Sequence, residues 1–177
     1  MTPDEQAPRS PSKRWVIVLL VVLSTVTIDW FSKRWAEDHL RYTNTQSYLG
    51  DTFRIQYAEN TGAFLGLGNR WSPHTRFLVF TAATSLFLIF VAWTTLRHPE
   101  IDRLELIAVA LILGGGIGNL IDRILRHGAV VDFMNMGIGS LRTGIFNVAD
   151  VALTAGVLIW IFRGFPGKSA AAQDATT

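Results

Sequence analysis

Residues 114 to 150 read GGGIGNLIDRILRHGAVVDFMNMGIGSLRTGIFNVAD, and this stretch decides how the rest of the chain is organised. Asp122 ends one long apolar run, Asp150 opens another, and Asp132 lies between them in an extended-looking VVDF segment. A chain that folds back between the two apolar runs would bring the three carboxylates together. Carboxylates at membrane depth cost about a few kcal/mol each, and their default interpretation is functional. The stretch therefore predicts a site.

Two asparagines accompany these acids at helical spacing. Asn119 lies three residues before Asp122, and Asn147 lies three residues before Asp150. Residues at this spacing share one face of a helix, so we expect each asparagine to lie beside its aspartate. Arg123 follows Asp122 directly, which gives this acid the appearance of a structural one.

The composition indicates a membrane protein. Of the 177 residues, 49% are hydrophobic and 17% are charged, which is unusual for a soluble domain of this length. The small, dispersed net charge of +2 argues against nucleic acid as a partner. The chain has no cysteine, and its four histidines show no metal-ligand spacing, so neither thiol chemistry nor a metal site is expected.

The apolar residues fall into four blocks, and the uncharged block at 77–96 is long enough for a helix that crosses a core of roughly 30 Å. The predicted fold is an all-α membrane protein with four transmembrane helices, at residues 15–30, 77–96, 104–121 and 145–162. A signal peptide is the alternative for the first block, but no small-residue cleavage site follows it. The expected organisation is a membrane domain at 15–163 between disordered cytoplasmic tails at 1–14 and 164–177.

The longest part outside the predicted membrane helices is 42–76, between the first and second helices. Phe53, Ile55 and Tyr57 alternate with polar residues, which is the period of a strand with one covered face. Glycines after Asn60 indicate turns. We therefore predict a small extramembrane β platform, with an ordinary connector as the alternative.

Asp29 and Lys33 stand at the end of the first predicted helix, at the spacing of an i,i+4 ion pair. A solvated pair of this kind stabilises a helix by about a few tenths of a kcal/mol. A membrane-embedded acid would instead be functional. The spacing alone leaves both interpretations open.

Four spans would place both termini on one side of the membrane and all the candidate acids, together with the 42–76 platform, on the other. Lysine and arginine are similarly numerous on the two sides, so the positive-inside rule does not orient the chain.

Asp132 and Asp150 have apolar sequence neighbours and no adjacent base, which makes them the best candidates for an interacting pair. Two close carboxylates tend to share one proton, leaving a base to activate water and an acid to protonate a leaving group. This arrangement suits amide hydrolysis. Paired membrane acids also serve proton transport, and a scaffold stabilised by pairs with Lys33 and Arg123 is a third possibility. Residue types and spacing alone do not decide between an enzyme and a transporter.

Five motifs in order decide between these alternatives. The motifs are DWFSK at 29–33, NTGAF at 60–64, GGGIGNLIDR at 114–123, VVDF at 130–133 and FNVAD at 146–150. With these motifs the chain resembles the lipoprotein signal peptidases, or signal peptidase II, which are membrane-embedded aspartic peptidases, over nearly all of residues 15 to 163. Trp30 departs from the glutamine that the family commonly has there.

The resemblance implies a catalytic dyad of Asp132 and Asp150. Eight further positions match residues that support the dyad or bind substrate: Asn119, Asp122, Arg123, Asn147, Asp29, Lys33, Asn60 and Gly62. It also implies cleavage of diacylglyceryl-modified prolipoproteins just before the lipidated cysteine, with membrane lipids as partners and no metal or organic cofactor. The expected location is the bacterial cytoplasmic (inner) membrane, with cytoplasmic termini, an active site toward the outer leaflet and a monomeric state.

Overall fold

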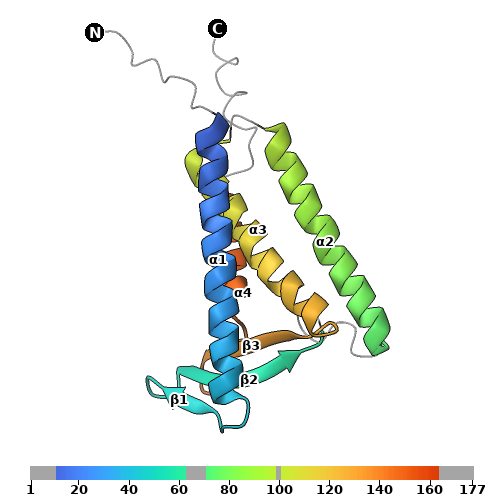
Figure 1. The fold of residues 1–177 in the computed structure, drawn as a ribbon. Helices are drawn as coiled ribbons and strands as arrows, with labels where there is room; N and C mark the ends of the chain where they lie inside the picture. The colour runs from blue at the N-terminus through green and yellow to red at the C-terminus, as the bar shows by residue number, and fades with distance from the viewer. Residues whose placement is uncertain (1–10, 63–70, 99–100, 164–177) are drawn as a thin grey trace, which may run out of the picture.

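The computed structural model describes residues 11–62, 71–98 and 101–163 (Figure 1). Residues 1–10 of the predicted tail at 1–14, the predicted tail at 164–177, and the glycine-rich part of the platform at 63–70 lie outside these ranges. The helices of the described chain are α1 Pro11–Leu40, α2 Pro73–Arg97, α3 Arg103–Leu125 and α4 Val148–Arg163. Its strands are β1 Gln46–Tyr48, β2 Phe53–Asn60, β3 Val130–Ile138 and β4 Leu141–Arg142. The sheet lies across one end of the helices (Figure 1).

The helix boundaries differ from the predicted ones. Helix α1 begins at Pro11 rather than at residue 15, so part of the predicted tail is helical. The Ser72 side chain caps α2 by accepting a hydrogen bond from the Thr75 amide. Helix α3 continues to Leu125, which places Asp122 inside a helix rather than after one.

The prediction of four transmembrane helices is only partly supported. Three helices, α1, α2 and α3, are long and apolar enough to cross a membrane. Helix α4 has 16 residues, which is shorter than the roughly 17 to 25 residues of a typical span. It is shorter than predicted because residues 145–147 join the sheet side of the structure, where Phe146 bridges to Met134.

Helix α3 packs against α1, α2 and α4, and small residues allow the close approach. A Cβ at Gly118 would lie 2.7 Å from Asp29 Oδ2, so only glycine lets this carboxylate reach α3. A Cβ at Gly115 would collide with the Ala149 carbonyl oxygen of α4. The glycine cluster therefore brings the acid of α1 and the start of α4 close to the same turns of α3.

The sheet corrects the prediction of an all-α fold with a platform made from 42–76 alone. Its strand order is β1-β2-β3-β4, and all its neighbouring strands are antiparallel. Half of the strands come from the segment that follows α3, with Ala58 of β2 opposite Asp132 of β3. A buried extended segment needs backbone partners, and β2 supplies them to β3. The segment around Asp132 is therefore part of the platform.

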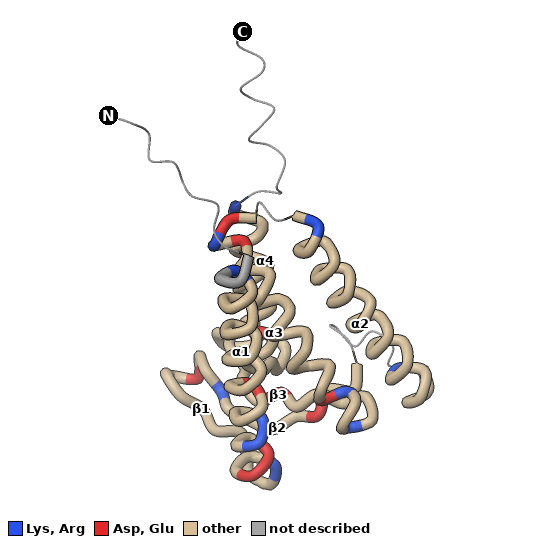
Figure 2. The backbone as a smooth tube through the Cα atoms, turned by 45° about the horizontal axis from the view of Figure 1, so that its top comes forward, with Lys and Arg blue, Asp and Glu red and all other residues tan. Residues whose placement is uncertain are grey.

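The chain reverses direction so that the start of α1, the end of α2, the start of α3 and the end of α4 meet at one end. Arg163 pairs there with Asp102, and the Arg14 guanidinium donates to the His98 carbonyl at 3.4 Å. Figure 2 shows charged residues gathered at this end and at the sheet end, with long uncharged stretches between them. The candidate acids lie toward the sheet end, which confirms that they share one side of the molecule.

Candidate active site

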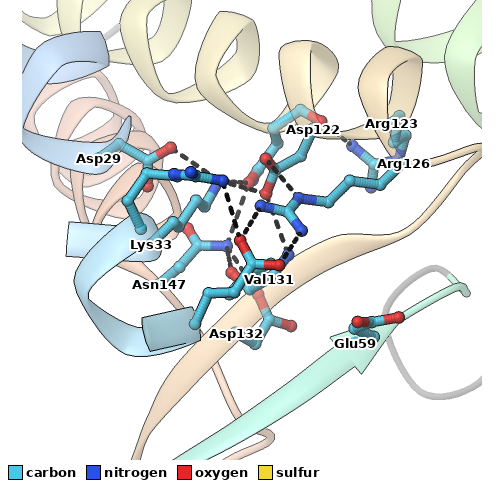
Figure 3. A network of polar contacts seen from close by, with 12 residues as sticks. Asp29, Lys33, Glu59, Asp122, Arg123, Arg126, Val131, Asp132 and Asn147 are labelled. Carbon is cyan, nitrogen blue, oxygen red and sulfur yellow. Dashed lines mark hydrogen bonds and ion pairs between the residues drawn. The ribbon is translucent and has the colours of Figure 1, made fainter. Parts of the chain in front are cut away.

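The predicted site residues meet where α1, α3, α4 and β3 come together, just above the sheet (Figure 3). Six of them are buried, namely Asp29, Lys33, Asn119, Asp122, Asp132 and Asn147, and Asp150 is half-buried. They come from α1, α3, β3 and the start of α4, so the site exists only in the folded protein.

Asn147 stands immediately before α4 and forms a reciprocal cap with Asp150. Its backbone amide donates to Asp150 Oδ2 at 3.1 Å, and the Asp150 amide donates to Asn147 Oδ1 at 2.9 Å. This is the geometry of a capping box, in which the third helical residue reaches back to the cap. The predicted pairing of this asparagine with this aspartate is confirmed.

The side-chain amide of Asn147 also reaches the second acid. Its Nδ2 donates to Asp132 Oδ1 at 2.7 Å and lies 3.1 Å from Asn119 Oδ1. One asparagine thus contacts Asp132 through its side chain and Asp150 through its backbone. This contact fixes the position of one carboxyl relative to the other.

The spacing predicted that Asn119 would pair with Asp122, but the two side chains do not pair. Its Nδ2 crosses to α4 and donates to Asp150 Oδ1 at 2.8 Å. The reason is packing, because the small residues of α3 let the start of α4 approach α3 closely beside Asn119.

Asn60 and Gly62 contribute from the end of β2. Asn60 Nδ2 donates to Asp132 Oδ2 at 3.1 Å, and the Gly62 amide donates to Asn60 Oδ1 at 3.1 Å. The turn at Gly62 therefore orients Asn60 toward the acid. Both predicted residues lie beside the site, and both oxygens of Asp132 accept a hydrogen bond from an asparagine.

Burial, together with the nearby Asp150 carboxylate, raises the pKa of Asp132 to about 7. The hydrogen bonds from Asn60 and Asn147 and the charge of Lys33 act in the opposite direction but do not cancel this effect. A carboxyl with this pKa retains a proton near neutral pH, as expected when two acids lie close together in a buried site.

Lys33 organises a second group of acids. Its Nζ lies 2.7 Å from Asp29 Oδ2 and 3.2 Å from Asp122 Oδ2, and all three side chains are 2% exposed. It also donates to Asn119 Oδ1 at 3.0 Å. The interpretation of Asp29 and Lys33 as a weak solvated pair is therefore wrong, because the pair is buried and shared with α3.

Asp29 and Asp122 both bind backbone amides beside the other two acids. The Ala149 amide donates to Asp29 Oδ1 at 2.8 Å, next to Asp150. The Val131 amide donates to Asp122 Oδ2 at 3.0 Å, next to Asp132. The geometry agrees with a structural role for Asp122.

Arg123 follows Asp122 in the sequence, but its guanidinium does not bind the Asp122 carboxylate. Its Nη1 donates to the carbonyl of Asn119 in its own helix at 3.3 Å, and it forms no ion pair with Asp122. Its Nε is buried without a hydrogen-bond partner in the described residues.

Sequence reasoning missed Arg126, which borders the site (Figure 3), and Glu37, to which Arg126 donates. The i,i+4 spacing of Asp122 and Arg126 was a usable signal, because these residues do pair, at 3.3 Å. No local signal connects Glu37 with Arg126, which are 89 residues apart. Among the described residues, no group of three or more His, Asp and Glu side chains could hold a metal ion.

Comparisons with known proteins find related sequences and a related fold. The family model for signal peptidase (SPase) II matches residues 21–165. A lipoprotein signal peptidase of Borrelia turicatae is 38% identical over 149 residues, covering 81% of this chain and 86% of its own. One of Pelodictyon phaeoclathratiforme is 36% identical over 162 residues, covering 84% and 92%. A bacterial membrane enzyme solved by the in meso method at 2.3 Å resolution superposes with a TM-score of 0.72 at 26% identity, covering 90% of this chain and 89% of its own.

Proposed function

Because the chain belongs to the signal peptidase II family, we propose that it is an aspartic endopeptidase whose catalytic pair is Asp132 and Asp150. It removes signal peptides from diacylglyceryl-modified bacterial prolipoproteins and cleaves just before the lipidated cysteine. The observation that carries this proposal is the joint contact of Asn147 with both carboxyls, at 2.7 Å to Asp132 and 3.1 Å to Asp150.

The pair divides the roles of acid and base. Asp132 holds the proton in the resting enzyme, because its pKa is about 7. Asp150 takes a proton from water, and the resulting hydroxide attacks the scissile carbonyl carbon. Asp132 donates its proton to the nitrogen that leaves, and the peptide C–N bond breaks. Each carboxyl ends in the protonation state opposite to the one in which it began, and exchange with solvent restores the pair.

The amides keep these roles separate. Asn119 and the Asn147 backbone donate to the two oxygens of Asp150, while Asn60 and the Asn147 side chain donate to those of Asp132. Fixed donors of this kind hold reacting groups without reorganisation during the reaction. Asn119, Asn147 and Asn60 are thus positioning residues. Lys33 and Gly62 donate to Asn119 and Asn60, while Asp29 and Asp122 accept from the backbone amides next to Asp150 and Asp132.

The substrate arrives from the membrane. The acyl chains remain in lipid beside the helices, and the peptide lies between the sheet and the two acids. Each buried methylene contributes about 0.8 kcal/mol, so lipid anchoring holds the substrate at the depth of the site. Arg123, whose Nε has no partner among the described residues, is available to bind the substrate peptide. The termini lie in the cytoplasm, the site faces the outer leaflet, and the enzyme is a monomer of the bacterial inner membrane.

A cleavage assay in detergent tests the proposal. A diacylglyceryl-modified prolipoprotein and its unlipidated form are incubated with the wild type and with Asp132→Asn and Asp150→Asn. We expect cleavage of the lipidated form alone, and a kcat lowered by about a thousandfold or more in both variants. The control is Asp51→Asn, which removes an aspartate of the same platform whose ion pairs, with Arg54 and Arg142, involve none of the predicted site residues.

Two results would count against the proposal. Turnover at the wild-type rate by a folded Asp132→Asn or Asp150→Asn variant would exclude the pair. Failure of the folded wild type to cleave the lipidated substrate would restore the transporter interpretation, which the clustering of the acids at one end of the helices disfavours.

A further inference from the structure

Arg126 connects two acids that belong to different helices, Glu37 of α1 and Asp122 of α3. It ends α3, where its backbone amide donates to the Asp122 carbonyl at 2.7 Å. Its Nη1 and Nη2 donate to the two oxygens of Glu37 at 3.0 and 2.8 Å, and its Nε faces Asp122 Oδ1 at 3.3 Å. The guanidinium therefore holds a bidentate pair on one edge and a second carboxylate on the other.

This contact is more enclosed than an ordinary surface pair. The side chains of Arg126 and Glu37 are 20% and 14% exposed. By contrast, Arg34 and Arg41, which also pair with Glu37, are 54% and 41% exposed. The Glu37–Arg126 pair is thus the inner part of a charged cluster, and the other two arginines are its rim.

Asp122 divides its two oxygens between different tasks. Its Oδ2 lies near Lys33 Nζ and accepts the Val131 amide. Within the described residues, Arg126 is the side-chain donor to its Oδ1. The contacts run without a gap from Glu37 through Arg126 and Asp122 to the residue before Asp132.

We propose that Glu37 and Arg126 are positioning residues for the Asp132 and Asp150 pair, which they affect through Asp122. This inference rests on the function proposed above. By holding Asp122 Oδ1, Arg126 fixes the carboxylate in the orientation that binds the Val131 amide with Oδ2. Glu37 fixes Arg126 from the end of α1, so the position of β3 depends on a contact between α1 and α3.

The loss of Arg126 would reach both acids. With Oδ1 unpartnered, the Asp122 carboxylate would turn to place both oxygens around the Lys33 ammonium. Lys33 would then leave Asn119 Oδ1, and Asn119 is the amide that donates to Asp150 Oδ1. At the same time the Val131 amide would lose its acceptor, and Asp132 would shift with it. Small misplacements of reacting groups lower the rate of reaction more than they lower binding.

The test measures kcat and KM for the lipidated substrate in Arg126→Gln, Arg126→Lys, Glu37→Gln and the double variant Glu37→Gln/Arg126→Gln. We expect Arg126→Gln to lower kcat about tenfold with KM within about twofold of the wild type. Arg126→Lys restores part of kcat, because it keeps the charge beside Asp122. The double variant matches Arg126→Gln, because Glu37 acts through Arg126.

Arg34→Gln is the matched control. It removes another partner of Glu37 but has no contact with Asp122, and we expect its kcat to equal that of the wild type. Hydrogen exchange of segment 129–135 adds a readout that does not depend on turnover. Exchange at Val131 should become faster in Arg126→Gln and Glu37→Gln and stay unchanged in Arg34→Gln.

Several outcomes would overturn the inference. They are a wild-type kcat in folded Arg126→Gln, a double variant whose loss is the sum of the single losses, or an equal loss in Arg34→Gln. If Arg126→Gln does not fold, Glu37→Gln carries the test, and its wild-type kcat and exchange would be decisive against the inference. A folded wild type without activity would instead overturn the proposed function.

Discussion

The site contains two pairs of acids that are buried in different ways. Asp29 and Asp122 form ion pairs with Lys33, and Asp122 also pairs with Arg126. Asp132 and Asp150 accept hydrogen bonds from amides and form no ion pair within the described residues. The first pair has its charge balanced by fixed cations. The second has no such balance, so charge on one acid opposes charge on the other.

This difference assigns the two pairs of acids to different roles, one pair holding the backbone in place and the other suited to proton transfer. A carboxylate with a buried cation holds backbone amides in place, as Asp29 does for Ala149 and Asp122 for Val131. A carboxyl held by neutral amides is free to gain and lose a proton. Asn119 stands between the groups, since it accepts from Lys33 and donates to Asp150.

Removal of Lys33 should have the largest effect on stability, because this cation balances the charge of the first pair of acids. Lys33→Met leaves two buried carboxylates without their shared cation, and breaking a buried ion pair from one side costs about 3 to 5 kcal/mol. We expect the free energy of unfolding in detergent to fall by about that amount, measured by thermal or chemical unfolding. The double variant Lys33→Met/Asp29→Asn should recover part of the loss. A loss below about 1 kcal/mol would show that the cation does not hold this group together.

The acids that are held by amides, Asp132 and Asp150, should make the stability of the protein depend on pH, and Asp132 gives the clearest expectation. The pKa of Asp132 is about 7 in the folded protein, against a usual value of about 4 for an unfolded aspartate. Between these values the folded state binds the extra proton, so the stability present at low pH is lost as pH rises through 7. We expect the stability difference between wild type and Asp132→Asn to fall by on the order of 1 to 3 kcal/mol across this window.

Unfolding midpoints of both proteins from pH 4 to pH 8 provide the measurement. Asp51→Asn, in the same platform, is the control for general effects of an aspartate replacement. A difference between wild type and Asp132→Asn that stays constant with pH would mean that Asp132 does not hold a proton in the folded state.

Replacement of an arginine at the rim of the charged cluster should have the smallest effect on stability. Arg41 pairs with Glu37 and Glu59, each at 3.2 Å, but its side chain is 41% exposed. Exposed pairs contribute about 0 to 1 kcal/mol, so Arg41→Gln should change the free energy of unfolding by less than about 1 kcal/mol. The same unfolding assay as for Lys33→Met makes the two values directly comparable. Equal losses would remove the distinction between buried and rim cations.

Much of the site could be predicted from the sequence alone. Carboxylates and asparagines in an otherwise apolar chain are conspicuous, because such residues are costly in a membrane unless they have a role. The apolar blocks located the helices. Because successive helices run in opposite directions, the acids were expected at a common end. The five motifs identified the family before any contact was known.

The tertiary structure decided which residue touches which. Spacing predicted that Asn119 would lie beside Asp122, but helix packing turned it toward Asp150 of α4. The partner of β3 is β2, far earlier in the chain, so the sheet could not be assembled from 42–76 alone. The contact between Glu37 and Arg126 has no local signal in the sequence, because it depends on how α1 and α3 pack. Residue types and periods are local properties, whereas pairing, burial and the resulting pKa values arise when distant segments exclude water together.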